Sequence, residues 1–251
     1  MKISMVGHST VLIETAGRRI LTDPFFGLHG NVAYKRLRPP AWRREELTKI
    51  DLVLVSHNHF DHTDGLYFRA LPLGVPVVAP SKTAWMTRLK GARNVTGMRV
   101  WEKHRFNDIS ITAVPAVHST VTRGYVIESV GRRIYFAGDT YFAPYMEKIA
   151  QDFRPQVVLM PVSTFRLPLT MGEEAAVAAA KLLRPEVVIP IHLGITPRMP
   201  HLRGSGSPER FIELMQRAGL RTQVALLGEG ESWSDTTSDR EFAAAAASQS
   251  E

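Results

Sequence analysis

The sequence predicts one large domain of mixed strands and helices, followed by a short tail. The chain has 251 residues, 44% of them hydrophobic, which is enough for one sizeable core. Apolar and polar residues alternate in the first segments, as in strands that bury one face. Two continuous apolar runs, at 156–161 and 186–191, are typical of strands buried on both faces, and a strong helix-forming segment separates them. We therefore expect a domain at 1–233 and a tail at 234–251.

The amino-terminal half is predicted to be rich in strands. Alternation indicates strands at 2–6, 10–15 and 18–22, with the turn AGRR between the last two. A basic, aromatic loop follows at 24–42. The next segments are predicted as a short helix, a strand, a helix, a strand and a helix capped by Ser81, at 43–49, 52–56, 64–71, 75–79 and 81–89. Four further strands are expected at 98–102, 108–116, 123–129 and 132–138.

The second half is predicted to alternate helices with strands. Phe142, Met146, Ile149 and Phe153 are spaced by four, three and four residues, which places them on one helical face in the core. Further helices are expected at 172–183 and 208–218, and a strand at 222–227. The segment from Ser234 onward has few core-forming residues, so we expect it to be disordered.

Composition limits the chemistry and the partners. No apolar run is long enough to cross a bilayer, and the first residues resemble a strand more than a signal peptide. The lack of cysteine excludes thiolate ligands and disulfides, and fits a reducing, cytoplasmic location. The net charge of +7 suits acidic partners such as phosphate esters or anionic lipid, or is simply that of a basic protein. We expect no stable nucleic-acid partner and leave peripheral membrane contact and oligomeric state open.

The segment VLVSHNHFDHTDG, at 53–65, places several ligand-type side chains directly after a buried strand. A lone histidine is more often a loop or core residue. Four residues in the pattern His-x-His-x-Asp-His are too many for one open tetrahedral metal site but suit half of a two-metal site. Three later apolar strands also end in such a residue, and the whole set is His57, His59, Asp61, His62, His118, Asp139 and His192.

This ordered set resembles the metallo-β-lactamase superfamily. The resemblance implies an α+β four-layer αββα sandwich with the site at one edge of its two sheets. It also implies that His57, His59 and His118 hold one metal ion and that Asp61, His62 and His192 hold a second, with Asp139 bridging them. The two ions would be divalent, with zinc favoured and manganese or iron as alternatives.

Finer motifs resemble the branch that contains N-acylphosphatidylethanolamine-hydrolysing phospholipase D and the ascorbate-phosphate lactonases. They are GHSTVLIE, LTDPFF, LVSHNHFDH, FAGDTYFAPYMEKI, GEEAAVAAAKLLRPEVVIPIH and LLGEGES. Two segments depart from that branch: PLTMG stands where the phospholipase has a histidine, and HLGIT follows the last ligand in place of an aromatic segment.

The resemblance suggests roles for residues around the metals. A bridging hydroxide would attack a phosphoryl or carbonyl centre, with Asp61 and Asp139 as catalytic residues. His8 would contact substrate or donate a proton, or be structural. Asp23, Thr140 and Ser56 would support the ligands, or merely cap strand ends. The remaining candidates bind an anionic, amphiphilic substrate or are ordinary loop residues: Tyr34, Lys35, Arg36, Arg38, Arg198, His201 and Arg203.

The leading functional hypothesis is a dinuclear metallohydrolase that acts on a small or lipid-like anionic ester of the phosphodiester type. The alternative is a hydrolase of lactones or amides. A di-iron redox protein and a non-catalytic module are much less favoured, because His59 is present and the ligand set is intact.

Overall fold

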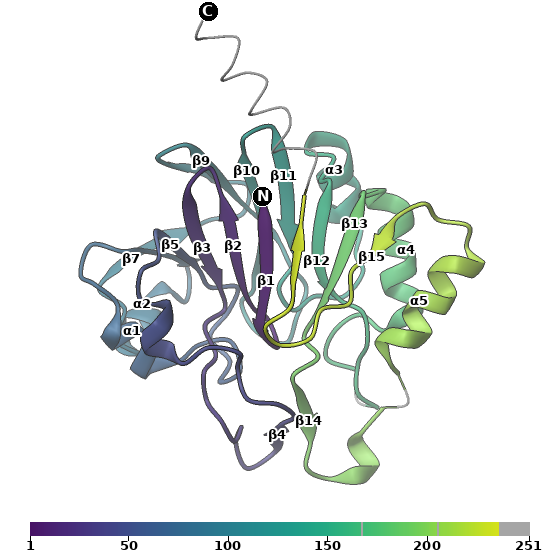
Figure 1. Cartoon of the computed structure of the whole chain (residues 1–251), viewed down its shortest axis with the longest axis horizontal. Helices are drawn as coiled ribbons and strands as arrows, with labels where there is room; N and C mark the ends of the chain where they lie inside the picture. The colour runs from purple at the N-terminus through teal and green to yellow at the C-terminus, as the bar shows by residue number, and fades with distance from the viewer. Residues whose placement is uncertain (167, 205, 236–251) are drawn as a thin grey trace, which may run out of the picture.

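Two seven-stranded sheets face each other in the computed structural model, which describes residues 1–166, 168–204 and 206–235 (Figure 1). The first sheet has the order β16-β1-β2-β3-β5-β6-β7. Its strands are β16 (Ser232–Ser234), β1 (Lys2–Gly7), β2 (Thr10–Thr15), β3 (Arg18–Thr22), β5 (Leu52–Leu54), β6 (Pro76–Pro80) and β7 (Asn94–Met98).

The second sheet has the order β15-β13-β12-β11-β10-β9-β8. Its strands are β15 (Gln223–Val224), β13 (Val187–Ile191), β12 (Val157–Pro161), β11 (Arg132–Phe136), β10 (Arg123–Ser129), β9 (Ile109–Pro115) and β8 (Lys103–Phe106). In each sheet one half is antiparallel, with strands joined mostly by short turns, and the other half is parallel, with helices as crossovers.

Helices cover the outer face of each sheet (Figure 1). α1 (Gly65–Ala70), α2 (Ala84–Leu89) and the 3-10 helix η1 (Arg44–Leu47) pack on the first sheet. α3 (Tyr145–Asp152), α4 (Glu173–Leu183) and α5 (Pro208–Arg217) pack on the second. A third apolar cluster, which includes Ile13, Leu52, Ile111 and Ile189, fills the space between the sheets. These layers confirm the αββα sandwich, and the runs at 156–161 and 186–191 are buried on both faces as predicted.

Several predicted elements needed correction. Of the strand expected at 98–102, only Met98 is in a strand, as the last residue of β7. The rest form a turn before β8, in which Glu102 accepts from the Arg99 amide and donates its own amide to the Arg99 carbonyl. Helix α2 begins after Thr83, not at Ser81, whose amide bonds to Met98. Phe142 precedes α3 and is exposed, so only the middle of the predicted face, Met146 and Ile149, is buried.

Two irregular segments contain an unpredicted strand each. β4 (Tyr34–Arg36) and β14 (Ile195–Pro197) pair antiparallel and form a separate two-stranded sheet, which projects from one end of the sandwich (Figure 1). The short 3-10 helix η2 (Pro200–Leu202) follows β14.

The predicted boundary between domain and tail falls inside a strand. Ser234 pairs with Lys2 in the first sheet, and buried Asp235 forms an ion pair with Arg132 at 2.6 Å. The domain therefore continues at least to Asp235, because this pairing completes the sheet beyond β1. The rest of the predicted tail, 236–251, lies outside the described residues. Within the described part, no helix has the length and apolar character needed to cross a membrane.

One buried hydroxyl links the two sheets and gives a stability test. Tyr125 in β10 donates to the Val55 carbonyl, just after β5, at 2.8 Å. Tyr125→Phe should lower the free energy of unfolding by about 1–3 kcal/mol, because it leaves a buried carbonyl without a partner. Urea denaturation measures the change. Tyr141→Phe removes a similar bond at the surface, to Pro168, and should change stability little; equal effects of the two substitutions would contradict the linking role.

Candidate metal centre

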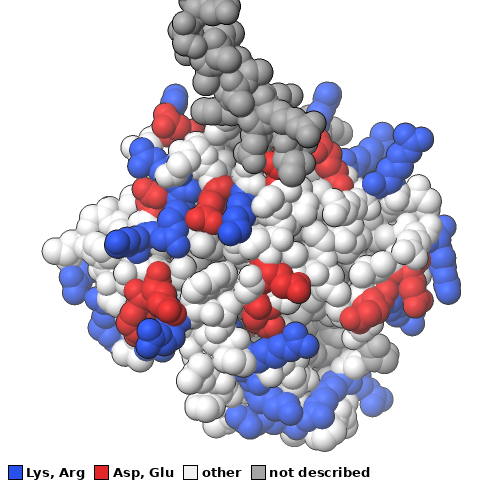
Figure 2. Space-filling model, viewed as in Figure 1, with Lys and Arg blue, Asp and Glu red and all other residues white. Residues whose placement is uncertain are grey.

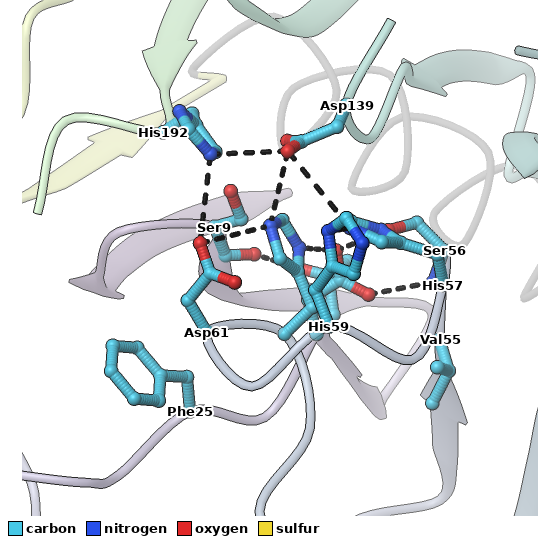
Figure 3. Close-up of polar contacts among 12 residues, drawn as sticks. Ser9, Phe25, Val55, Ser56, His57, His59, Asp61, Asp139 and His192 are labelled. Carbon is cyan, nitrogen blue, oxygen red and sulfur yellow. Dashed lines mark hydrogen bonds and ion pairs between the residues drawn. The ribbon is translucent and has the colours of Figure 1, made fainter. Parts of the chain in front are cut away.

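Loops at one end of the sandwich bring the predicted ligands together (Figure 3). His57 to His62 follow β5, His118 follows β9, Asp139 follows β11 and His192 follows β13. These strands end at the same edge of the molecule, so residues far apart in sequence meet there. The turn between β1 and β2 adds His8 to the same cluster.

The first group contains His57, His59 and His118. His59 Nδ1 lies 3.0 Å from His57 Nε2 and 3.4 Å from His118 Nε2. Ligand atoms around a tetrahedral zinc ion lie roughly 3.3 Å apart when each bond is about 2.0 Å long. The three nitrogens therefore have the spacing that one metal ion requires.

The second group contains Asp61, His62 and His192, with His8 beside them. Asp61 Oδ2 lies 3.7 Å from the Nε2 atoms of both His62 and His192. A carboxylate and two imidazoles at this spacing also suit a divalent cation of the zinc type.

Asp139 lies between the two groups (Figure 3). Its Oδ2 is 3.1 Å from His192 and 3.4 Å from His62 in the second group. The same oxygen is 3.7 Å from His118 and 4.0 Å from His57 in the first. One carboxylate thus contacts histidines of both groups, as the bridging role requires.

Two buried atoms test whether a cation fits here. His62 Nε2 and Asp139 Oδ1 have no hydrogen-bond partner among the described residues. A buried polar atom without a partner is costly. His62 Nε2 faces the cluster, 3.4 Å from Asp139 Oδ2 and 3.7 Å from Asp61 Oδ2. Burial alone would lower the pKa of His62, but the carboxylates of Asp139, Asp61 and Asp23 raise it well above its ordinary value. The surroundings thus favour positive charge at this point, which a divalent cation would supply.

Protonation states elsewhere in the cluster agree with metal binding. Burial, together with the nearby His62, lowers the pKa of His57 well below its ordinary value. Burial opposes ionisation of Asp139, but His192 and His62 outweigh it and hold its pKa well below the usual range. Neutral imidazoles and ionised carboxylates are the forms that bind divalent metals.

Asp23 orients one histidine of each group. Fully buried, it accepts from the Ser56 amide, the Ser56 hydroxyl and His62 Nδ1, each at 2.6 Å. The Ser56 hydroxyl, having donated to Asp23, accepts from His57 Nδ1 at 2.9 Å. Both imidazoles therefore carry a proton on Nδ1 and turn Nε2 toward the site, the atom that a metal ion would bind in place of a proton.

Two further contacts brace His118. Its Nδ1 donates to the Leu169 carbonyl at 2.9 Å, which leaves Nε2 free to face the cluster. Thr140 was predicted to support the ligands, but the described hydrogen bonds of its hydroxyl go to Val117, Tyr141 and Tyr145 and not to a ligand side chain. It accepts from the Val117 amide at 3.0 Å and so joins the segment before His118 to the segment after Asp139.

The contacts of His8 fit the structural one of the roles expected for it. It is buried, and its Nδ1 accepts from the Gly194 amide at 3.0 Å, so the proton lies on Nε2, which donates to Asp61 Oδ2 at 3.2 Å. Burial, with the nearby His192, lowers the pKa of His8 to about 3, so the ring is neutral. A β-carbon on Gly194 would lie 2.8 Å from that of His8, so this approach requires glycine. The geometry makes His8 a positioning residue for Asp61.

The backbone is unusual at three residues of the cluster. His8, Asp23 and His192 have φ angles of 63°, 34° and 65°, in the left-handed region that side-chain-bearing residues rarely adopt. All three stand where a strand gives way to a sharp turn.

Lys90, which belongs to none of the sequence motifs, stabilises the loop at 57–62 that carries the first ligands. Half-buried Lys90 donates to the Asn58 carbonyl at 2.8 Å and to the Thr63 hydroxyl. Thr63 in turn donates to the His59 carbonyl at 2.9 Å. Sequence reasoning missed Lys90 because it lies at the end of α2, with no ligand pattern around it.

The predicted substrate residues of the 24–42 loop divide into two kinds. Tyr34 lies beside the site: its ring packs on Phe60 at 6.1 Å and on Phe165 at 5.7 Å, and Phe165 is 6.5 Å from His192. Lys35 is exposed. Arg36 is buried and donates to the carbonyls of Phe25, Gly27 and Arg38, so its predicted contact with substrate is wrong. Its guanidinium instead holds the loop together.

A cavity of about 560 Å³ opens beside His192. Its wall includes Arg38, Phe165, Arg203 and Glu229. Arg198 and His201 are exposed but do not line this cavity. The Arg198 side chain instead donates to the carbonyls of Asn31 and His29 and straps the 24–42 loop to the segment after His192.

Comparisons with known proteins agree with this geometry. The beta-lactamase superfamily domain matches residues 18–193. A UPF0173 metal-dependent hydrolase of Methanopyrus kandleri is 31% identical over 245 residues, which is 93% of this chain and 99% of that protein. Among solved structures, a metallo hydrolase of Ignicoccus hospitalis has a TM-score of 0.76 and 28% identity, with 94% of this chain and 99% of that chain covered. An isothiocyanate hydrolase from Delia radicum gut bacteria has a TM-score of 0.79, 20% identity and the same coverage, and shares the fold.

The Asp23 network predicts a loss of metal affinity on substitution. Asp23→Asn cannot accept all three of the hydrogen bonds described, because one oxygen becomes a donor. We expect zinc affinity to fall by about 10–100-fold, the usual cost of removing such a support. Competition with a chelating dye measures the affinity, and circular dichroism checks the fold. Asp152→Asn, which affects only an exposed pair with Lys148, is the control; unchanged affinity in Asp23→Asn would contradict the orienting role.

Proposed function

The chain belongs to the UPF0173 metal-dependent hydrolases of the metallo-β-lactamase superfamily, and from this premise we propose that it holds two divalent metal ions and hydrolyses an anionic ester. The observation that carries the proposal is the position of Asp139, whose Oδ2 contacts histidines of two separate ligand groups. A donor set of imidazoles and carboxylates without thiolates favours zinc, with manganese or iron as alternatives.

When bound, two such ions would activate a water molecule near neutral pH and stabilise charge on the leaving oxygen. The protein's own residues set the geometry. Asp23 holds the Nδ1 side of His57, through Ser56, and of His62, and His8 holds Asp61, which would orient the water. His192 lies in the cavity wall, so a substrate held in the cavity has its reacting centre beside the metal groups.

The cavity mouth supports an amphiphilic anionic ester as substrate. The rings of Tyr34, Phe60 and Phe165 offer an apolar surface, and Arg38 and Arg203 offer positive charge beside it. The motifs shared with the phospholipase D and ascorbate-phosphate lactonase branch support a phosphodiester-type group. Glu209, Glu229 and Glu231 in the same wall reduce the positive potential, which favours neutral lactones or amides as the second candidate class.

The two-metal proposal predicts the metal content. Elemental analysis of protein expressed with ample metal should give about two ions per chain. Dialysis against a chelator should remove them together with the activity, and added zinc should restore both. A content below about one ion per chain, with no gain on adding metal, would contradict the proposal.

The bridging position predicts which carboxylate matters most. Asp139→Ala should lower hydrolysis of a bis-aryl phosphodiester by more than about a hundredfold, with the fold retained, because both metal groups lose a common ligand. His104→Ala is the matched control. His104 lies in β8 and pairs with Glu102, and it belongs to neither ligand group, so activity should stay near normal. Near-normal turnover by Asp139→Ala would contradict the proposed two-metal mechanism.

Exposed charge on the 24–42 loop predicts substrate preference. Lys35→Ser/Arg38→Ser should raise KM for an anionic diester several-fold more than for a neutral lactone, with metal content unchanged. Arg36 is left intact because its side chain holds the loop. Lys82→Ser/Arg221→Ser, at exposed positions elsewhere, controls for net charge. Equal effects on both substrate types would remove the proposed charge selection.

A further inference from the structure

Residues 27–38 and 194–203 form a projection that we call the tip. It carries β4 and β14 and stands out from the end of the sandwich opposite the first residue (Figure 1). Its two segments are tied together beyond the strand pairing. The Leu37 amide donates to Gly194, the Arg198 amide donates to Ala33, and the Arg198 side chain donates to Asn31 and His29. The tip is therefore one ordered unit.

The tip is positively charged. It contains five arginines and lysines and no aspartate or glutamate. Arg36 is internal, but four cations are exposed: Lys35, Arg38, Arg198 and Arg203. Figure 2 shows Lys and Arg gathered at the lower end of the molecule, where Figure 1 places β4 and β14, with the nearest acidic side chains above them. Glu229 reaches Arg38 at the base of the tip, at 3.5 Å.

The tip also exposes large aliphatic side chains. Val32 is 95% exposed, Leu28 59%, Leu37 52% and Met199 51%. Elsewhere in the described part, such side chains are spread over several elements, with at most two on any one helix, Trp85 and Leu89 on α2. Four exposed aliphatic side chains lie on this one small projection, among cations. An exposed apolar patch with a polar rim is typical of an interaction surface.

The combination of exposed cations and exposed aliphatic side chains on the tip favours one kind of binding partner over others. A second copy docked tip to tip would bring like charges together. Nucleic acid would meet aliphatic groups that neither stack on bases nor donate hydrogen bonds to them. An anionic lipid bilayer suits both features, because aliphatic side chains enter the boundary between headgroups and acyl chains while lysine and arginine contact phosphates.

We propose that the tip docks this protein on the surface of anionic membranes. Val32, Leu28 and Met199 enter the headgroup region, and Lys35 and Arg198 contact anionic headgroups. β14 begins three residues after His192, so docking brings the membrane surface to the mouth of the candidate site. The docking does not depend on the proposed reaction, and its test measures binding without turnover.

Co-sedimentation of the full chain with lipid vesicles tests the docking. The protein should sediment with vesicles of phosphatidylcholine and phosphatidylglycerol but not with vesicles of phosphatidylcholine alone, and high salt should weaken the binding. Absence of binding to the anionic vesicles, or equal binding to both kinds, would overturn the proposal.

Matched variants distinguish binding through the tip from non-specific hydrophobic binding by other surfaces. Leu28→Ser/Val32→Ser should weaken binding to anionic vesicles by at least about tenfold, because apolar contact is lost while charge is kept. Leu73→Ser/Leu89→Ser changes two equally exposed apolar residues outside the tip, 65% and 76% exposed, and should bind as the unchanged protein does. Full retention by the tip variant overturns insertion. The proposal is also overturned if duplex DNA displaces the protein completely from the vesicles while Leu28→Ser/Val32→Ser has no effect on binding. That result would identify a nucleic-acid surface.

Discussion

The candidate centre depends on one buried carboxylate, that of Asp23. It stands directly after β3, beside the parallel strand β5, and its amide donates to the Leu54 carbonyl at 2.8 Å. This register brings Ser56 and His62 within reach of the same side chain. A buried charge is tolerated only when hydrogen bonds surround it, and three donors do so here. The pairing of two strands thereby sets the direction of one imidazole in each ligand group.

The sequence was most informative where chemistry and strand ends coincide. The ligand-type residues each follow an apolar run, and strands that end at one edge bring their next residues together whatever their separation in the chain. Asp139 and His192 both follow such runs, and the family resemblance placed them beside His57. The continuous apolar runs likewise predicted the central strands β12 and β13. The order of layers came from the family resemblance, not from periodicity.

Features that depend on distant partners were not predictable. β4 and β14 are too short for alternation to show, and each becomes a strand only by pairing with the other. Arg36 looks like a surface cation in sequence, but three carbonyls of its own loop take up its guanidinium. His8 was expected near substrate, but the amide of Gly194, far along the chain, decides which of its nitrogens faces Asp61. The predicted domain boundary cut β16 before its last residue, Ser234, because a strand of three residues shows no pattern.

The backbone is strained at the edge of the sheets that carries the candidate centre, because His8, Asp23 and His192 adopt left-handed φ angles. Each such residue costs about 1–2 kcal/mol relative to ordinary geometry, and the interlocked sheets on either side keep it from relaxing. The rigid frame and the reactive edge are thus thermodynamically coupled. A substitution that weakens the pairing or packing of β3, β5 or β13 would let these residues relax to ordinary backbone angles. The ligand geometry would then change before the molecule unfolds. The tip contains none of these three residues, so substitutions there leave that strain in place.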